Sequence, residues 1–344
     1  MRLGGRGAAL PHDSQARPST QNATPEASKP IAKLQTANFI FIYIVSIFQE
    51  STPAMHGAKK QHYLPCVYLK QFSSAGANAT RTSKVWRLDS KRCIEVTVKS
   101  EGHEKYFYSK SDPEKPESHF GNIEMQYGLI AQKIWRSQVP TRNDYFGLIV
   151  VMIDIHLRSP IYQNQTGAEN FKAYETRVSS LGNILGVPKS DAAMHEIKES
   201  FRKFWRVRLL KSAPNYEFIT SDCPSLWFTT DEHQGPQFFI MPITPFHLAV
   251  AFDLRHVRMQ RSNQITNHDQ LTVTRDLIGH SQNAIYCREK PSLEMIEKIR
   301  TCLSRRRTPT GVTNNYESYG PLLVWSEEDR LDFVNPVRPP AKVL

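Results

Sequence analysis

Four polar residues lie in segments that are otherwise largely apolar, and their side chains could act together on a phosphorylated substrate. They are His62, Glu124, Arg158 and Asp222. A histidine can move a proton near neutral pH, while two carboxylates can bind a metal ion or orient a water molecule. The planar guanidinium of an arginine suits a phosphate or carboxylate group. Together the four would suit a hydrolase that acts on nucleic acid or another phosphorylated substrate.

The same four residues also have ordinary structural roles. His62 could hydrogen-bond to the chain at the start of a core segment, and Glu124 could stabilise the start of its helix. Arg158 could pair with Asp154 one helical turn earlier, or cap the last helix carbonyls. Asp222 precedes a Cys-Pro pair and could accept backbone N–H groups in a turn. These roles predict a soluble binding or regulatory module with a buried polar network, and this is the interpretation that we favour.

The sequence patterns of well-known catalytic and cofactor sites are absent. The chain has no G-x-x-x-x-G-K-[ST], G-x-G-x-x-G, G-x-S-x-G or H-E-x-x-H pattern. Its 12 histidines include no pair with the surroundings of a metal site. We therefore predict no metal site, and the sequence identifies no cofactor.

The charge of the chain suggests an anionic partner. The formal net charge is +11, from 44 Lys and Arg residues against 33 Asp and Glu residues. A basic balance favours polyanions, so nucleic acid or a phosphorylated ligand is the expected partner. The candidate anion-binding residues are Arg158 and the run Arg305, Arg306 and Arg307. Such a run is also typical of a solvated helix end, and many soluble proteins are basic.

The cysteines favour a reducing compartment. There are five, widely spaced and without a C-x-x-C pair: Cys66, Cys93, Cys223, Cys287 and Cys302. An odd number without paired spacing argues against a disulfide framework and against a zinc knuckle. We therefore expect buried thiols in a cytoplasmic protein.

The first 54 residues differ in composition from the rest of the chain. Residues 1–38 are rich in Gly, Pro and small polar residues, which predicts disorder. Residues 39–48 form an apolar run that is shorter than the roughly 20 residues needed to span a bilayer, so we predict no stable transmembrane span. A secretory or membrane-associated segment stays an alternative. Met55 could equally be the true start, which would make residues 1–54 a mis-annotated extension.

Hydrophobic periodicity predicts an α+β fold. Period-two alternation over residues 85–88 and 94–98, with turn residues between them, indicates a β-hairpin. The helical patterns that follow cover about residues 122–134, 143–157 and 190–205. Short strands are then predicted at 218–220, 226–228, 238–240 and 248–252, and a last helix at 293–303. We expect an N-terminal β-hairpin, central helices, then a mostly antiparallel sheet and a C-terminal helix.

These elements would form a single α+β domain over residues 55–310, followed by a partly ordered tail over residues 311–344. A polar, Pro-broken loop over residues 111–117 precedes the first helix, whose N-cap would be Asn122. This start would place Glu124 in the first helical turn, where the helix dipole favours a carboxylate. The second helix is apolar around most of its circumference, which is typical of a central buried helix.

The chain resembles an uncharacterised family, domain of unknown function 4238, over about residues 59–290. The resemblance rests on these motifs, in this order: H-Y-x-P-x-x-Y-L-x-x-F at 62–72, I-E at 123–124, R-S-P at 158–160, F-I-T-S-D-C-P at 218–224 and P-I-T-P at 242–245. A helix that contains Asn267 and a strand at 284–287 follow. Cys223 stands where the family usually has Asn, and Asp154 or His156 where it has Gln. Members usually begin a few residues before the His, which supports Met55 as the start, and the resemblance implies no activity.

Overall fold

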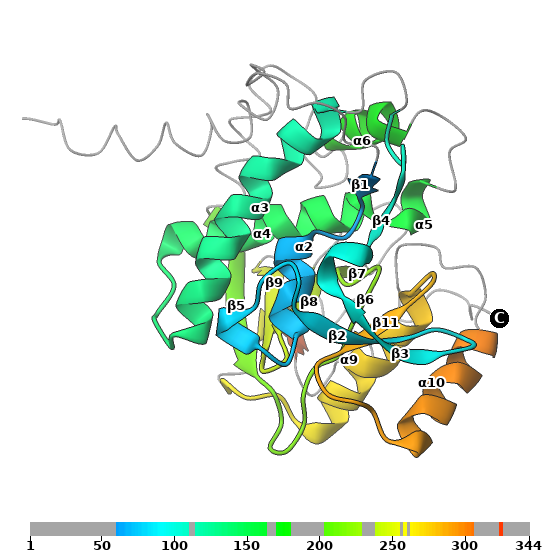
Figure 1. The fold of residues 1–344 in the computed structure, drawn as a ribbon. Coiled ribbons are helices and arrows are strands. Elements are labelled where there is room, and N and C mark those ends of the chain that lie inside the picture. The colour runs from blue at the N-terminus through cyan, green and yellow to red at the C-terminus, as the bar shows by residue number, and fades with distance from the viewer. Residues whose placement is uncertain are drawn as a thin grey trace, which may run out of the picture.

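The computed structural model describes residues 60–109, 114–163, 170–179, 203–228, 238–254, 257–259, 262–305 and 323–325 (Figure 1). The predictions of disorder at 1–38, of an apolar segment at 39–48 and of a start at Met55 lie outside these residues. So do Arg306, Arg307 and most of the helix predicted over 190–205.

The structure contains both helices and strands throughout the described part of the chain. The strands are β1 (Lys60–His62), β2 (Lys84–Leu88), β3 (Cys93–Thr97), β4 (His103–Lys105), β5 (Trp205–Lys211), β6 (Thr220–Ser221), β7 (Leu226–Phe228), β8 (Phe238–Thr244), β9 (His247–Asp253), β10 (Val257–Met259), β11 (Ile285–Cys287) and β12 (Leu323–Trp325). The α-helices are α2 (Cys66–Leu69), α3 (Glu114–Trp135), α4 (Arg142–Arg158), α5 (Pro160–Gln163), α6 (Asn170–Ser179), α9 (Asn267–His280) and α10 (Leu293–Arg305). Three short 3-10 helices are η1 (Lys70–Phe72), η2 (Gly76–Asn78) and η3 (Val98–Ser100).

The strands form antiparallel sheets. One four-stranded sheet has the order β3-β2-β11-β6 and the other has the order β5-β9-β8-β7, while β1-β4 and β10-β12 are two-stranded. Every one of these strand pairs is antiparallel. The predicted hairpin is present as β2 and β3, and the predicted C-terminal helix is present as α10. The predicted α+β class, with its antiparallel sheet, is therefore confirmed.

Helix α3 begins eight residues before its predicted start (Glu114 instead of Asn122). The prediction of a loop over residues 111–117 was wrong for Glu114 onward, because Pro116 falls in the first turn of the helix. Proline is tolerated there since backbone N–H groups in the first turn have no intrahelical acceptor. As a consequence, Asn122 is not an N-cap and Glu124 lies in the middle of α3, so its predicted place at a helix start was also wrong.

Strand β5 replaces the predicted end of the third helix. Trp205 was expected on a helix face, but residues Trp205–Lys211 pair with His247–Asp253 of β9 along their whole length. The hydrogen bonds to a distant strand outweigh the local helical pattern at Trp205. Neither β5 nor α6 was predicted.

Helix α4 is the central buried helix that the sequence predicts. It begins with a capping box in which the Thr141 side chain accepts from the Asp144 N–H and the Asp144 side chain accepts from the Thr141 N–H. It ends at Arg158, with Ser159 as the C-cap and Pro160 following. Residues 151–161 are all buried, so the polar side chains at the end of α4 are enclosed in the protein.

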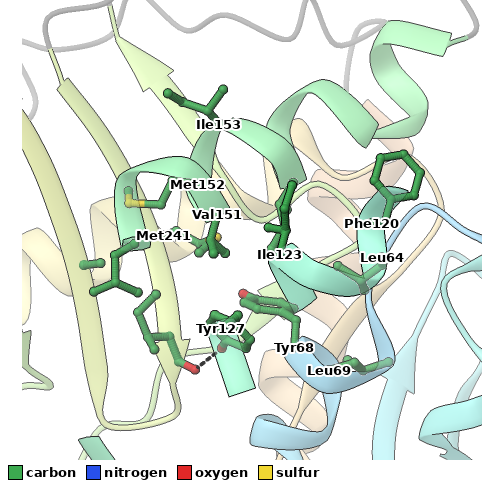
Figure 2. Close-up of a cluster of buried hydrophobic side chains, with 14 of the residues drawn as sticks. Leu64, Tyr68, Leu69, Phe120, Ile123, Tyr127, Val151, Met152, Ile153 and Met241 are labelled. Atoms are coloured by element: carbon green, nitrogen blue, oxygen red, sulfur yellow. Dashed lines mark hydrogen bonds between the residues drawn. The ribbon is translucent and has the colours of Figure 1, made fainter. Parts of the chain in front are cut away.

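The sheet that contains β8 is covered on both faces. Phe239, Met241 and Ile243 belong to a hydrophobic cluster with α2, α3 and α4, and Figure 2 shows how Tyr68, Tyr127 and Met241 gather there. The alternate residues Phe238 and Ile240 belong to a second cluster, with α9 and α10. Because successive strand residues point to opposite faces, β8 carries apolar residues throughout. Among the described residues, no helix is long and apolar enough to span a membrane.

Candidate functional site

Arg158 is the centre of a buried ion-pair network. Its guanidinium Nη1 donates to Glu124 Oε1 at 3.0 Å and to Asp154 Oδ2 at 3.3 Å. Its Nη2 donates to Glu124 Oε1 at 3.1 Å and to the His62 backbone carbonyl at 2.6 Å. The guanidinium carbon lies 3.7 Å from the centroid of the Phe120 ring, a cation–π geometry. Only 1% of the Arg158 side chain is exposed, so these partners enclose the charge.

The network extends beyond the arginine through two tyrosines. The Tyr174 hydroxyl donates to Asp154 Oδ1 at 2.7 Å, and the Tyr108 hydroxyl donates to the Arg158 carbonyl at 3.3 Å. Burial raises the pKa of the Asp154 carboxyl, and Arg158 and Tyr174 oppose this rise. Burial opposes the charge on Arg158, but Asp154 and Glu124 raise its pKa well above the usual value. A cation stays in place here because it is paired and hydrogen-bonded.

The guanidinium faces the protein's own carboxylates. Of the roles that the sequence allowed for Arg158, pairing with Asp154 one turn earlier is confirmed. A phosphate that used the same donors would have to displace Glu124 or Asp154. Its role as an anion clamp therefore stays a prediction, and the geometry gives that role no support.

The backbone of His62 joins the network, and its side chain contacts a second histidine. It pairs with His103 across β1 and β4, and their ring centroids are 5.2 Å apart at an interplanar angle of 73°. Burial lowers the pKa of His62 to about 3, with further lowering by His103, Arg158, Arg81 and Lys60. The imidazole is therefore neutral at pH 7.

Asp222 fastens a turn that joins α9 to β11. Its Oδ1 accepts from the Gln282 N–H at 2.8 Å and its Oδ2 accepts from the Asn283 N–H at 2.6 Å. Its own N–H donates to the Ala284 carbonyl at 3.1 Å. These contacts match the turn-forming role that the sequence allowed. The direct link to the first motif is electrostatic: after burial, the Asp222 carboxylate is the largest cause that raises the pKa of the Tyr63 hydroxyl.

The structure thus joins three of the four predicted residues by direct bonds. His62, Glu124 and Arg158 form one connected set, whereas the carboxylate of Asp222 binds the backbone of a different segment. A joint catalytic role for all four stays a prediction. Arg305 ends α10, but its side chain, like Arg306 and Arg307, lies outside the described part of the chain.

Tyr68 connects three of the sequence motifs. Its hydroxyl lies 2.7 Å from Thr220 Oγ1 and donates to the Pro242 carbonyl at 2.8 Å. Thr220 belongs to the F-I-T-S-D-C-P motif and Pro242 to the P-I-T-P motif. The ring of Tyr68 is fully buried. Its hydroxyl thus joins motifs that are widely separated in the sequence.

Several residues of the site escaped the sequence reasoning. Gln61 is fully buried, and its Oε1 accepts from the Tyr108 N–H at 2.6 Å and from the Ser109 N–H at 3.1 Å. His103 and Tyr174 were not singled out either. Strand β4 carried no clear alternation, and α6 was not predicted, so the sequence held no signal that could place either side chain beside its partner.

The described residues offer no ready metal centre. In the described ranges from residue 60 to residue 325, no group of three or more His, Cys, Asp and Glu side chains could hold a metal ion. All five cysteines are free thiols, and Cys66, Cys223 and Cys287 are buried.

The fold is that of an α+β protein with antiparallel sheets and packed helices. A buried arginine network lies at the end of the central helix, and polar contacts join distant motifs. The chain belongs to the family described as "Protein of unknown function (DUF4238)", which matches residues 60–299. This match confirms the resemblance drawn from the motifs. No curated protein and no solved structure matches the chain significantly. The family description assigns no activity, so the activity of the protein is not established.

Proposed function

We propose that this protein is a binding or regulatory module in which the Arg158 network holds the scaffold together. The observation that carries the proposal is the set of four hydrogen bonds from the guanidinium to Glu124, Asp154 and the His62 carbonyl. A buried polar network rigidifies a fold and helps to specify it when its members are hydrogen-bonded. Both terminal nitrogens of the Arg158 guanidinium are hydrogen-bonded, whereas its buried Nε has no partner. Arg158 donates hydrogen bonds to residues of three elements: β1, α3 and α4.

The alternative, a hydrolase that uses His62, Glu124, Arg158 and Asp222, receives less support. A general base works best when its pKa lies near the operating pH. The pKa of His62 lies at about 3, so its imidazole is a weak base. The Asp222 oxygens accept backbone N–H groups, and the Glu124 carboxylate pairs with Arg158.

The ligand of the module, in our proposal, is anionic. The net charge of +11 favours nucleic acid or a phosphorylated molecule, and Arg305, Arg306 and Arg307 remain candidates for contacting it. We also propose a cytoplasmic location, because all five cysteines are free thiols.

A comparison of activity with stability tests the proposal. Full-length protein is incubated with a phosphomonoester, a phosphodiester and DNA or RNA, with Mg²⁺ or with EDTA, and the Glu124→Gln variant is treated alongside. We expect no turnover by the wild type and a lower melting temperature for Glu124→Gln, because that variant loses the charge opposite Arg158. A different result would favour the hydrolase over the binding module. The wild type would turn over a substrate, and Glu124→Gln would abolish this turnover without changing the melting temperature.

A further inference from the structure

One face of the β1–β4 ribbon gathers four basic side chains. The register places Lys60 opposite Lys105 and His62 opposite His103. Side chains alternate along a strand, so these four share one face, while Gln61 and Glu104 point to the other. Like charges placed directly opposite each other destabilise a strand pair. The ribbon therefore keeps an arrangement that costs free energy unless an anion accompanies it.

The permanent charges on this basic face lack carboxylate partners. Lys60, Lys105 and nearby Arg81 form no ion pair with any residue in the described part of the chain. Arg81 lies close enough for its charge to act on both His62 and Glu124. Glu124, the carboxylate on which the Arg81 charge acts, is 3.0 Å from Arg158 and is paired with it. A surplus of positive charge remains.

His103 adds an unused hydrogen-bonding atom. Its Nε2 is buried and has no hydrogen-bond partner. A buried polar atom in this state costs free energy unless a ligand or water meets it. The His103 ring lies beside the His62 ring, with their centroids 5.2 Å apart.

Two adjacent imidazoles could in principle bind either a metal ion or an anion, and the surrounding charges decide between them. A divalent cation here would be repelled by Lys60, Lys105 and Arg81. An anion would be attracted by all three and could accept hydrogen bonds from imidazole N–H groups. The electrostatic environment therefore favours the anion.

We propose that the basic face of the β1–β4 ribbon, formed by Lys60, His62, His103 and Lys105 with Arg81 beside it, binds the phosphate group of a small phosphorylated ligand. The inference rests on the proposed binding function and gives it a location. A single-stranded nucleic acid is a less suitable ligand, because such strands bind through stacked aromatic side chains. Among the described residues, Tyr216 is the one exposed large aromatic, and it lies in the loop between β5 and β6.

The electrostatics of His62 supply an independent signature. Burial is the largest cause that lowers the pKa of His62, and the neighbouring cations lower it further. A bound dianion would partly neutralise those cations, so the pKa of His62 would rise as the ligand binds. The charged groups that face it are His103, Arg158, Arg81 and Lys60. Sulfate stays dianionic from pH 5 to 8, so its affinity should rise as the pH falls.

Calorimetric titration of full-length protein with inorganic phosphate and with sulfate tests the site. We expect Arg81→Gln and Lys105→Gln each to weaken binding about three- to fivefold, the size of one screened charge interaction. Arg136→Gln and Lys91→Gln, which remove exposed charges elsewhere, should leave the affinity unchanged. His62→Gln should flatten the pH dependence of sulfate binding.

Three outcomes would overturn the site. They are no phosphate binding, equal losses in the test and control variants, or Zn²⁺ binding that His103→Gln abolishes while phosphate has no effect. An oligonucleotide that binds far more tightly than phosphate, with the same variant losses, would replace the small ligand with nucleic acid. If the protein neither binds phosphate nor turns over a substrate, only the phosphate site is excluded. If it turns over a phosphomonoester, the proposed function as a binding module is excluded.

Discussion

The Arg158 guanidinium donates a hydrogen bond of 2.6 Å to the backbone carbonyl of His62, and so joins the last residue of α4 to the last residue of β1. The two residues are 96 positions apart in the chain. The same guanidinium binds Glu124 of α3. One buried charge therefore joins the first sequence motif, the central helix and the helix before it.

Replacement of Arg158 should destabilise the protein strongly. Arg158→Met leaves Asp154 and Glu124 without their cation, and loss of one partner of a buried pair costs about 3–5 kcal/mol. Urea unfolding measures the loss. The control Arg275→Met removes an arginine whose side chain is 56% exposed and should change stability little. Equal midpoints for wild type and Arg158→Met would contradict a structural role.

Tyr68 and Thr220 should be energetically coupled. Tyr68→Phe removes a hydroxyl that contacts Thr220 Oγ1 and the Pro242 carbonyl, and should cost about 1–3 kcal/mol because a buried acceptor loses its donor. A double-mutant cycle with Thr220→Val should give a coupling of about 0.5–1.5 kcal/mol. The change Tyr216→Phe, at an exposed residue, is the control. Strict additivity in the cycle would show that the hydroxyl contact carries no energy.

Two substitutions of Asp222 should destabilise the protein to different degrees. Asp222→Ala loses both carboxylate oxygens that accept from backbone N–H groups and should cost about 2–3 kcal/mol, whereas Asp222→Asn keeps one oxygen and should cost less. Asp89 is a matched comparison, since its Oδ1 accepts two backbone N–H groups at 2.8 Å and 2.7 Å in the exposed β2–β3 turn. Asp89→Ala should be milder. If Asp222→Ala melts like the wild type, the carboxylate is not holding the turn.

Stability should fall in acid partly because of His62. Its pKa is depressed from 6.5 to about 3 in the folded protein, so the unfolded chain binds a proton first. The contribution of His62 to the free energy of unfolding is fully present above pH 6.5. It is lost as the pH falls toward 3, by at most about 1.4 kcal/mol per pH unit. The partial exposure of His62 makes the real slope smaller.

Unfolding of wild type and His62→Gln between pH 7 and 4, in buffer without phosphate, isolates this contribution. The pKa values of His247 and His280 are also lowered by burial, so both proteins should lose stability and His62→Gln should lose less. The control His268→Gln changes a side chain that is 72% exposed and should keep the wild-type slope. Identical slopes in all three proteins would show that His62 is not buried as described.

Local sequence patterns predicted the elements that depend on near neighbours. The β2–β3 hairpin has turn residues between two alternating segments, and α4 has a continuous apolar face and a proline after its end. The motif around His62 correctly indicated the family. The pairing of Arg158 with Asp154 was also accessible, because residues four apart on a helix are neighbours.

The sequence by itself thus determined the α+β class, the family, the buried central helix and a short list of polar residues that tie the fold together. Tertiary structure alone decided what those residues contact. The pairing of β1 with β4 sets His62 beside His103, and the pairing of β5 with β9 turns Trp205 from helix to strand. The physical reason is that periodicity reports contacts along one element, whereas these contacts join segments 41 and 48 residues apart, which no local pattern encodes (103 − 62 = 41; 253 − 205 = 48).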